Sequence, residues 1–261
     1  MDISLKDKTA VICGSSQGIG FAAAKVLAML GANCILIARD EVKLKEAVSH
    51  LSASEGQKHS YQVADFSELK TVEQAINHII KDHTVHVLIN NTGGPKSGPI
   101  IEAEISDFEN AFRQHLSCNH VLVNAVLGGM KGAGYGRIIN IISTSVRTPL
   151  QNLGVSNTIR AAVASWAKTL SNEIGAFGIT VNNVLPGLTE TARLASLVQA
   201  SAKSLNIEEE KAAAQMAATV PMKRFGQPEE IANVIAFLAS PAASYVNGTS
   251  IPVDGGRTPT V

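Results

Sequence analysis

The sequence has few of the residues that mark several protein classes. It holds one tryptophan, and its 22 lysines and arginines balance its 22 aspartates and glutamates. A chain without a basic surplus lacks the field that attracts nucleic acid, so we expect no nucleic-acid partner. It also has neither an apolar run near the roughly 18 residues of a membrane helix nor an apolar leader, which predicts a cytoplasmic protein without membrane contact.

Cysteine is also scarce, and its pattern excludes two chemistries. Cys13, Cys34 and Cys118 form neither a CxxC pair nor a cluster with histidine. An odd, scattered set favours reduced thiols in the core of a cytosolic protein over disulfides or a metal site. We therefore expect small molecules and further copies of the chain as partners, and no metal.

Apolar runs rich in isoleucine and valine alternate with longer segments of helical period. This alternation is typical of βαβ units that build a parallel sheet. The strands are predicted at Thr9–Cys13, Cys34–Ala38, His59–Ala64, Val85–Asn90, Gly136–Ile142, Thr180–Leu185 and Thr249–Val253. The helices are predicted at Ile19–Leu30, Val42–Ser54, Glu68–Lys81, Ser106–Lys131, Leu153–Phe177 and Pro228–Leu238. Right-handed crossovers of this length predict a doubly wound α/β fold with helices on both faces of the sheet.

The length and the absence of a linker indicate one domain over residues 1–261. Within it, the segment from Ala192 to Phe225 is rich in alanine and serine, has helical spacing and carries few large apolar residues. We interpret this segment, at about 190–225, as a mobile lid.

A glycine-rich loop follows the first predicted strand directly and opens the first predicted helix. It reads Gly14-Ser15-Ser16-Gln17-Gly18-Ile19-Gly20. Glycines allow a tight turn and close approach of the backbone to a pyrophosphate, whose charge then meets the free N–H groups of the helix N-terminus. Such a loop alone could be a simple turn, but its place between strand and helix predicts a dinucleotide site.

Further motifs follow other strands and extend the pattern from Lys8 to Gly256. They are Asp65-Phe66, Asn90-Asn91-Thr92-Gly93, Pro186-Gly187-Leu188-Thr189-Glu190-Thr191, the segment Pro221–Glu230, and Val253-Asp254-Gly255-Gly256. With the glycine loop, they make the chain similar to the short-chain dehydrogenase/reductase family, most of all to its 3-oxoacyl-acyl-carrier-protein-reductase-like branch. The resemblance implies a single-domain Rossmann fold with a seven-stranded parallel sheet.

The same resemblance implies roles for these motifs. Asp65 would bind the adenine end of the cofactor, while the backbone and threonines of Pro186–Thr191 would hold the nicotinamide carboxamide. Family members usually form tetramers through two long helices, here Ser106–Lys131 and Leu153–Phe177, and through the last helix and strand. We therefore expect a homotetramer with dihedral symmetry.

The residue after the second strand bears on cofactor choice. An NAD-binding member usually has an acid there for the ribose 2′-hydroxyl, whereas this chain has Ala38-Arg39-Asp40. A guanidinium can bind a 2′-phosphate with two hydrogen bonds. We predict NADP(H) in preference to NAD(H), against the alternative that Arg39 merely pairs with Asp40, Glu41 or a neighbouring helix.

The family's catalytic residues are Asn, Ser, Tyr and Lys, and this chain matches only the serine, at Ser143. Serine stands at the tyrosine position, Ser156, and arginine at the lysine position, Arg160. The asparagine position falls on His115, with Asn119 one helical turn further along the same face. We interpret Ser143, Ser156, Arg160 and His115 as the catalytic candidates.

These replacements weaken acid catalysis. An alcohol is a weaker acid than a phenol by about 5 pKa units, or roughly 7 kcal/mol for full proton transfer. Arg160 can still donate to the ribose hydroxyls but stays charged and passes no proton. His115 could act as a new acid, because imidazole titrates near neutrality, although nearby Arg160 should depress its pKa.

Two functions stay open at this point. The first is an NADP(H)-dependent oxidoreductase for a carbonyl or alcohol substrate, with weak or altered activity. The second is a non-catalytic dinucleotide-binding homologue that acts as a sensor or an assembly partner, because one scaffold can host both.

Overall fold

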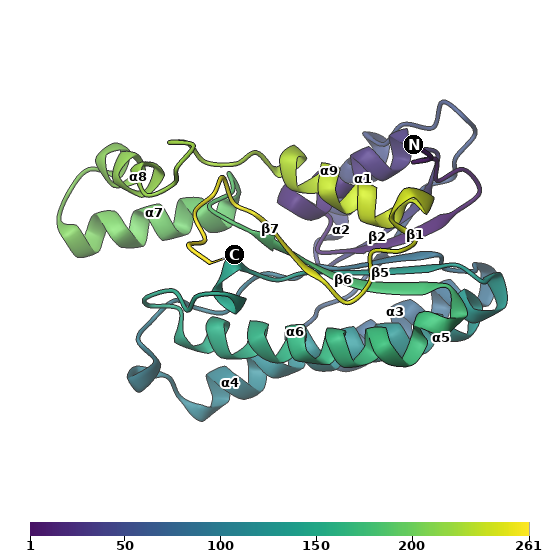
Figure 1. Cartoon of the computed structure of the whole chain (residues 1–261), viewed down its shortest axis with the longest axis horizontal. Helices are drawn as coiled ribbons and strands as arrows, with labels where there is room; N and C mark the ends of the chain where they lie inside the picture. Colours follow the sequence, from purple (N-terminus) through teal and green to yellow (C-terminus); the bar gives the residue numbers. More distant parts are fainter. Residues whose placement is uncertain (261) are drawn as a thin grey trace.

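The computed structural model describes residues 1–260, and its centre is one sheet of seven parallel strands (Figure 1). The strand order is β3-β2-β1-β4-β5-β6-β7. The strands are β1 (Thr9–Cys13), β2 (Asn33–Ala38), β3 (Ser60–Val63), β4 (Val87–Asn90), β5 (Gly136–Ile141), β6 (Ile179–Pro186) and β7 (Ser250–Val253). The reversal of order between β1 and β4 makes the sheet doubly wound, which confirms the predicted Rossmann fold.

Helices cover both faces of the sheet, because successive strand residues point to opposite sides. Ala10 and Ile12 face one core, whereas Val11 and Cys13 face the other. The first core is closed by α1 (Gly18–Met29), α2 (Glu41–Ser49) and α9 (Pro228–Ala239). The second is closed by α3 (Leu69–Asp82), α5 (Cys118–Ala133) and α6 (Gly154–Ile174), with α4 (Ile105–Phe112) at its end. All three cysteines are free and buried, as expected of core thiols.

Two predicted helices differ from the structure in ways that have a physical cause. The predicted helix Ser106–Lys131 is divided by a π-helical turn at Arg113–Ser117, between α4 and α5. Such a turn inserts a residue and redirects the side chains that follow, and it is often found at functional sites. The helix predicted at Leu153–Phe177 ends at Ile174, followed by a 3₁₀ turn and by Gly178 with a left-handed φ of 75°.

A row of polar side chains crosses the sheet from the carboxyl end of β4 to the first residue of β7. Asn90 donates to Asn140 at 2.8 Å, and Asn140 donates to Asn183 at 2.9 Å. Asn183 in turn donates to the Ser250 hydroxyl at 3.1 Å. Because these residues are register partners on β4, β5, β6 and β7, the row fixes the register of the four strands that carry the loops of the site.

The alanine- and serine-rich segment forms two helices, α7 (Ala192–Leu205) and α8 (Glu209–Ala218). They pack on each other around a small cluster of Leu194, Val198, Ala202 and Ala212, apart from the two main cores. Figure 1 shows both helices extending beyond one end of the sheet. Within residues 1–260, no helix is both long and apolar enough to cross a membrane.

Candidate active site

A cavity of about 1440 Å³ lies where the loops after six strands meet α7. Parallel α/β sheets bind ligands at this place, outside the carboxyl ends of their strands and next to the point where the strand order reverses. Pockets for a single small ligand usually measure about 300–1,000 Å³. This cavity therefore has room for a dinucleotide together with a second, smaller molecule.

The backbone of the glycine loop is shaped as an anion cradle. Gly14 and Gly18 have φ angles of 56° and 59°, which other residues rarely adopt. A Cβ on Gly14 would lie 2.5 Å from the Asn91 carbonyl oxygen, so the close approach also requires glycine. The first turn of α1 is Gly-Ile-Gly-Phe and directs its N–H groups and the positive helix end at the cavity. This geometry fits a pyrophosphate.

The structure divides the predicted loop residues into two groups. Those that line the cavity are Gly14, Ser16, Gln17, Gly18 and Ile19. Ser15 and Gly20 are buried, and neither is among the described residues that line it. The Ser15 hydroxyl donates to the Ile12 carbonyl at 2.7 Å and accepts from the Ile37 N–H at 3.1 Å, so it holds the loop against β2.

Arg39, directly after β2, is exposed and lines the cavity. The acids next to it have other partners: the Asp40 carboxylate caps α2 by accepting from the Lys43 N–H at 3.1 Å, and Glu41 pairs with Lys45 at 2.9 Å. Within residues 1–260, Arg39 forms no ion pair within 4 Å. The competing interpretation, in which Arg39 pairs with Asp40 or Glu41, does not describe the structure.

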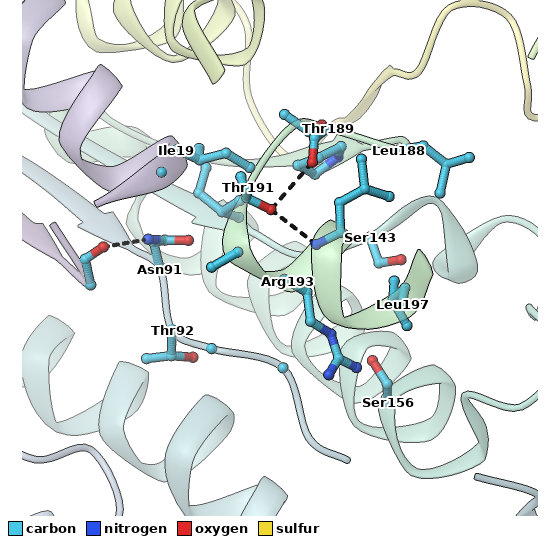
Figure 2. Close-up of a pocket in the computed structure, with 18 of the residues that line it drawn as sticks. Ile19, Asn91, Thr92, Ser143, Ser156, Leu188, Thr189, Thr191, Arg193 and Leu197 are labelled. Atoms are coloured by element: carbon cyan, nitrogen blue, oxygen red, sulfur yellow. Dashed lines mark hydrogen bonds between the residues drawn. The ribbon is translucent and has the colours of Figure 1, made fainter. Parts of the chain in front are cut away.

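Asp65 and Asn91 hold the loops on the same side of the cavity as the glycine loop. The Asp65 carboxylate accepts from the backbone N–H and hydroxyl of Ser67 at 2.9 and 2.7 Å, which lowers the pKa of Asp65, with a smaller effect from Arg39. The Asn91 amide donates to the carbonyls of Cys13 and Gly14 at 3.2 and 3.1 Å (Figure 2). Phe66, Thr92 and Gly93 line the cavity beside these residues.

The loop after β6, which was predicted to hold the nicotinamide carboxamide, forms another part of the cavity wall. Pro186, Gly187, Thr189 and Thr191 all line the cavity. The Thr191 hydroxyl donates to the Thr189 carbonyl at 3.2 Å and accepts from the Leu194 N–H at 3.4 Å, so it caps α7 (Figure 2). The loop predicted to hold the carboxamide therefore also fixes where α7 begins.

Ser143 and Ser156 both line the cavity, from the end of β5 and the first turn of α6 (Figure 2). The Ser143 oxygen accepts from the Ser145 N–H at 3.1 Å, which caps a 3₁₀ turn and leaves the hydroxyl proton free to donate to a ligand. Ser156 is half-buried. The two hydroxyls can donate hydrogen bonds, but an unperturbed alcohol supplies a proton poorly.

Arg160 also lines the cavity, yet only 8 % of it is exposed. Its Nη1 donates to the Ile141 carbonyl at 2.7 Å, while its Nε has no hydrogen-bond partner among residues 1–260. Burial, and after it the charge of Arg193, lowers the pKa of Arg160 to about 10. The guanidinium therefore remains charged near neutral pH.

His115 lies behind the cavity wall instead of facing Ser143 and Ser156. It sits in the π-helical turn, is 2 % exposed, and its Nδ1 is 2.6 Å from the Thr92 hydroxyl. Burial, and after it the charge of Arg160, lowers the pKa of His115 well below its ordinary value. Neither His115 nor Asn119 is among the described residues that line the cavity, so the structure does not bring them to the two serines.

The sequence analysis missed Arg193, which lies in the first turn of α7. Its Nη2 donates to the Pro95 carbonyl at 2.8 Å, and Figure 2 shows its guanidinium directed toward Ser156. The residue belongs to no motif and falls in the segment interpreted as a lid from composition. The signal that was available is its position, two residues after Thr191 and next to the nicotinamide loop.

The arrangement of the sheet, the glycine cradle and the loops has close counterparts in known proteins. A family model described as enoyl-(acyl carrier protein) reductase matches residues 14–258. The chain belongs to the short-chain dehydrogenase/reductase family. The 3-oxoacyl-[acyl-carrier-protein] reductase FabG of Pseudomonas aeruginosa is 33 % identical over 258 residues, which cover 97 % of this chain and 98 % of that protein. This relative confirms the resemblance to the 3-oxoacyl-acyl-carrier-protein reductases.

Two solved members of this family have the same overall structure. The L-sorbose reductase of Gluconobacter frateurii, complexed with NADPH and L-sorbose, has a TM-score of 0.94 at 31 % identity, with all of both chains covered. YwfH, an NADPH-dependent reductase involved in bacilysin biosynthesis, has a TM-score of 0.92 at 30 % identity, with 97 % of this chain and 99 % of that chain covered.

Proposed function

We propose that this short-chain dehydrogenase/reductase is an NADP(H)-dependent oxidoreductase that acts on a carbonyl or alcohol group of a small molecule, with activity altered by Ser156 and Arg160. The observation that carries the proposal is one cavity that holds both a pyrophosphate cradle at Gly14–Gly20 and two hydroxyl donors, Ser143 and Ser156. A ligand at the cradle and a second ligand at the serines would share one continuous space.

The proposed preference for NADP(H) is supported by Arg39. It lines the cavity, it forms no ion pair within residues 1–260, and the neighbouring acids are engaged by lysines. A free guanidinium binds a phosphate with two charge-assisted hydrogen bonds, whereas it gains little from a ribose hydroxyl. The solved relatives described as NADPH-dependent or complexed with NADPH point the same way.

The bound nicotinamide would supply or accept a hydride. In this proposal Ser143 donates a hydrogen bond to the substrate oxygen and orients the reacting group. Arg160 stabilises the negative charge that develops on that oxygen, because a buried cation acts strongly in a site from which water is excluded. Ser156 donates a second hydrogen bond but supplies no proton at a useful rate, because an alcohol is too weak an acid. Activated carbonyls, whose alkoxides need little protonation, are therefore the favoured substrates.

The second candidate function is a non-catalytic dinucleotide-binding protein that acts as a sensor or an assembly partner. It is favoured by the position of His115, whose nearest polar partner is the Thr92 hydroxyl and whose pKa is depressed. No group that titrates near neutral pH is then in contact with the substrate position, so the chain could keep the cofactor without turning anything over.

Two measurements separate these functions. Fluorescence titration with NADPH and NADH tests binding, and NADPH oxidation is followed with β-ketoacyl thioesters, quinones and diketones. We expect NADPH to bind more tightly than NADH, with measurable turnover of the activated carbonyls and weak turnover of ordinary ketones. Tight binding without turnover of any of them would support the non-catalytic function. A chain that binds neither cofactor would contradict both.

We also propose a homotetramer with dihedral symmetry. Apolar side chains of the segment that leads into α4 and of α4 itself are exposed in the single chain: Ile101 is 90 % exposed and Ile105 is 73 % exposed. Such residues suit an isologous contact between copies. Light scattering at micromolar concentration should give the mass of four chains, whereas a stable monomer would contradict the proposal.

The lid is likewise a proposal, for the segment at about 190–225. Its support is that α7 and α8 pack around their own small cluster while residues of α7 line the cavity. Limited proteolysis should cut this segment first, and NADPH should slow the cutting. Equal cutting rates with and without NADPH would contradict the lid.

A further inference from the structure

Arg193 occupies a position that the helix itself does not favour. It is in the first turn of α7, where the positive end of the helix dipole repels a cation. The cap of this helix is supplied by Thr191, so Arg193 is not needed to begin it. Its one hydrogen bond, from Nη2 to the Pro95 carbonyl, uses one of five guanidinium N–H donors. Its placement therefore points to a partner outside the helix.

Arg160 also has more N–H donors than hydrogen-bond partners, and a comparison with Arg137 makes this clear. Arg137 is equally buried, but its guanidinium donates to the carbonyls of Ser240, Gly136 and Gly178 and lies 4.1 Å from the Tyr135 ring centroid. Arg160 donates to one carbonyl and leaves its Nε without a partner in residues 1–260. Buried charges are normally paired or fully hydrogen-bonded, so Arg137 has a structural role, while Arg160 has capacity left for a ligand.

The protein does not neutralise these two charges itself. Three acids line the cavity, and none lies within 4 Å of either arginine in the part of the chain that the structure describes. Asp65 accepts hydrogen bonds from Ser67, Glu229 pairs with Lys25 at 3.2 Å, and Glu190 is exposed. The two guanidiniums instead repel each other, and the charge of Arg193 contributes to the lowered pKa of Arg160. A buried and a half-buried cation that share one cavity without an acid partner indicate a site for an anion.

The phosphates of a dinucleotide do not account for this anion. The groups that fit them are the glycine loop after β1 and Arg39 after β2. Arg193, by contrast, points toward Ser156, on the side of the cavity that holds both serines (Figure 2). By the resemblance, Arg160 would face ribose hydroxyls, which carry no charge. The negative charge that would neutralise Arg193 and Arg160 therefore belongs to the second ligand.

We propose that the substrate carries a carboxylate close to its reacting carbonyl, and that Arg193 and Arg160 bind this carboxylate beside Ser156. The inference rests on the proposed oxidoreductase function and narrows its substrate class to keto acids or the corresponding hydroxy acids. A guanidinium fork matches a carboxylate in plane and spacing. The same two cations stabilise a developing alkoxide, which compensates in part for the absent acid at position 156.

Pairs of acids and methyl esters test the proposal, because within each pair the ester replaces the negative charge with a neutral group that is larger by one methyl. Calorimetric titrations use protein saturated with NADP⁺ and, as ligands, 2-oxopentanoate and 4-oxopentanoate with their methyl esters. We expect at least one acid to bind about tenfold or more tightly than its ester, the effect of a charge-assisted pair. Arg193→Met should abolish this preference and Arg193→Lys should keep part of it.

The matched control is Arg147→Met, which removes an exposed arginine that is not among the described residues lining the cavity. It should keep the full preference for the acid. Thermal unfolding of each variant checks that it is folded, and Arg193→Lys preserves the test if Arg193→Met is unstable. Equal affinities for acid and ester, no binding of either acid, or an unchanged preference in Arg193→Met would each overturn the inference.

The cofactor titration keeps this test separate from the proposed function. If NADP⁺ binds and the acids show no advantage, the carboxylate site is wrong and the oxidoreductase function stands. If NADP⁺ does not bind, the proposed function fails, and the same acid and ester pairs are titrated into the protein alone. A preference for the acid that depends on Arg193 would then still support the carboxylate site.

Discussion

At the dinucleotide end of the cavity the backbone supplies most of the polar groups, whereas at the opposite end they come from side chains. Gly14 and Gly18 set the shape of the first end, and Asn91 ties the loop to β4. At the second end, Ser143 and Ser156 present their hydroxyls, and Arg160 is buried with an Nε that lacks a partner within residues 1–260. A site made of backbone can change only if the fold changes, while a site made of side chains can change one residue at a time. We therefore expect the chemistry of this chain to differ from that of its family at the second end.

The largest expected effect comes from restoring the family's residues at the side-chain end. Ser156→Tyr together with Arg160→Lys should raise NADPH-dependent reduction of simple carbonyls by two orders of magnitude or more, because a phenol beside an ammonium donates a proton far better than an alcohol. Either replacement alone should do much less, since the two groups act as one unit. The measurement is kcat/KM of wild type, both single variants and the double variant.

A double variant that binds NADPH but gains no activity would show that the rest of this end, Arg193 included, has lost the geometry for simple carbonyls. If the wild type already turns over β-ketoacyl substrates at ordinary family rates, Ser156 is sufficient as it stands. Either result would overturn the distinction between a fixed dinucleotide end and an altered substrate end.

The second prediction compares the two buried arginines by stability. Arg137→Met should lower the free energy of unfolding by about 2–4 kcal/mol, because it removes three charge-assisted hydrogen bonds to carbonyls, of which those of Ser240 and Gly178 keep a backbone donor, at 3.3 and 3.4 Å. Arg160→Met should leave stability unchanged or raise it, because it removes a buried charge that has one hydrogen bond and no acid within 4 Å in the described chain. Thermal and denaturant unfolding at a fixed protein concentration, without cofactor, measures both. Equal losses would mean that Arg160 is structural.

The third prediction changes the charge of Arg39 at the dinucleotide end. Arg39→Asp should reverse the preference from NADPH to NADH, with a loss of about ten- to a hundredfold in NADPH affinity, because a phosphate partner is replaced by a like charge. Fluorescence titration with both cofactors checks it. The control is Lys43→Asp, which also replaces a positive charge with a negative one. Lys43 lies on α2 and is not among the described residues that line the cavity, so this variant should keep the preference for NADPH. Equal affinities of wild type for the two cofactors would contradict the role of Arg39.

The same contrast explains what could be predicted from the sequence. The sheet and the cradle follow from local patterns: apolar strands, and glycines placed between a strand and a helix. The π-helical turn at Arg113–Ser117 has no such pattern, because it depends on how α4 and α5 pack, and it turns His115 toward Thr92. Arg193 was missed because contact with Pro95 joins residues 98 positions apart in the sequence. Non-local contacts of this kind form most of the side-chain end.

The smallest expected effect tests whether His115 belongs to that end as a buried neutral group. Its folded-state pKa lies well below the value near 6.5 of the unfolded chain, so the unfolded state binds more protons as the pH falls below that value. Stability is therefore fully present above about pH 6.5 and is lost as the pH falls. Between pH 7.5 and 5.5 the wild type should lose about 1 kcal/mol more than His115→Asn, measured by denaturant unfolding, while His83→Asn, at an exposed site, should follow the wild type. An identical pH dependence of wild type and His115→Asn would mean that His115 can take up a proton in the folded protein. His115 would then again be a candidate for the catalytic acid, against the evidence of its position behind Thr92.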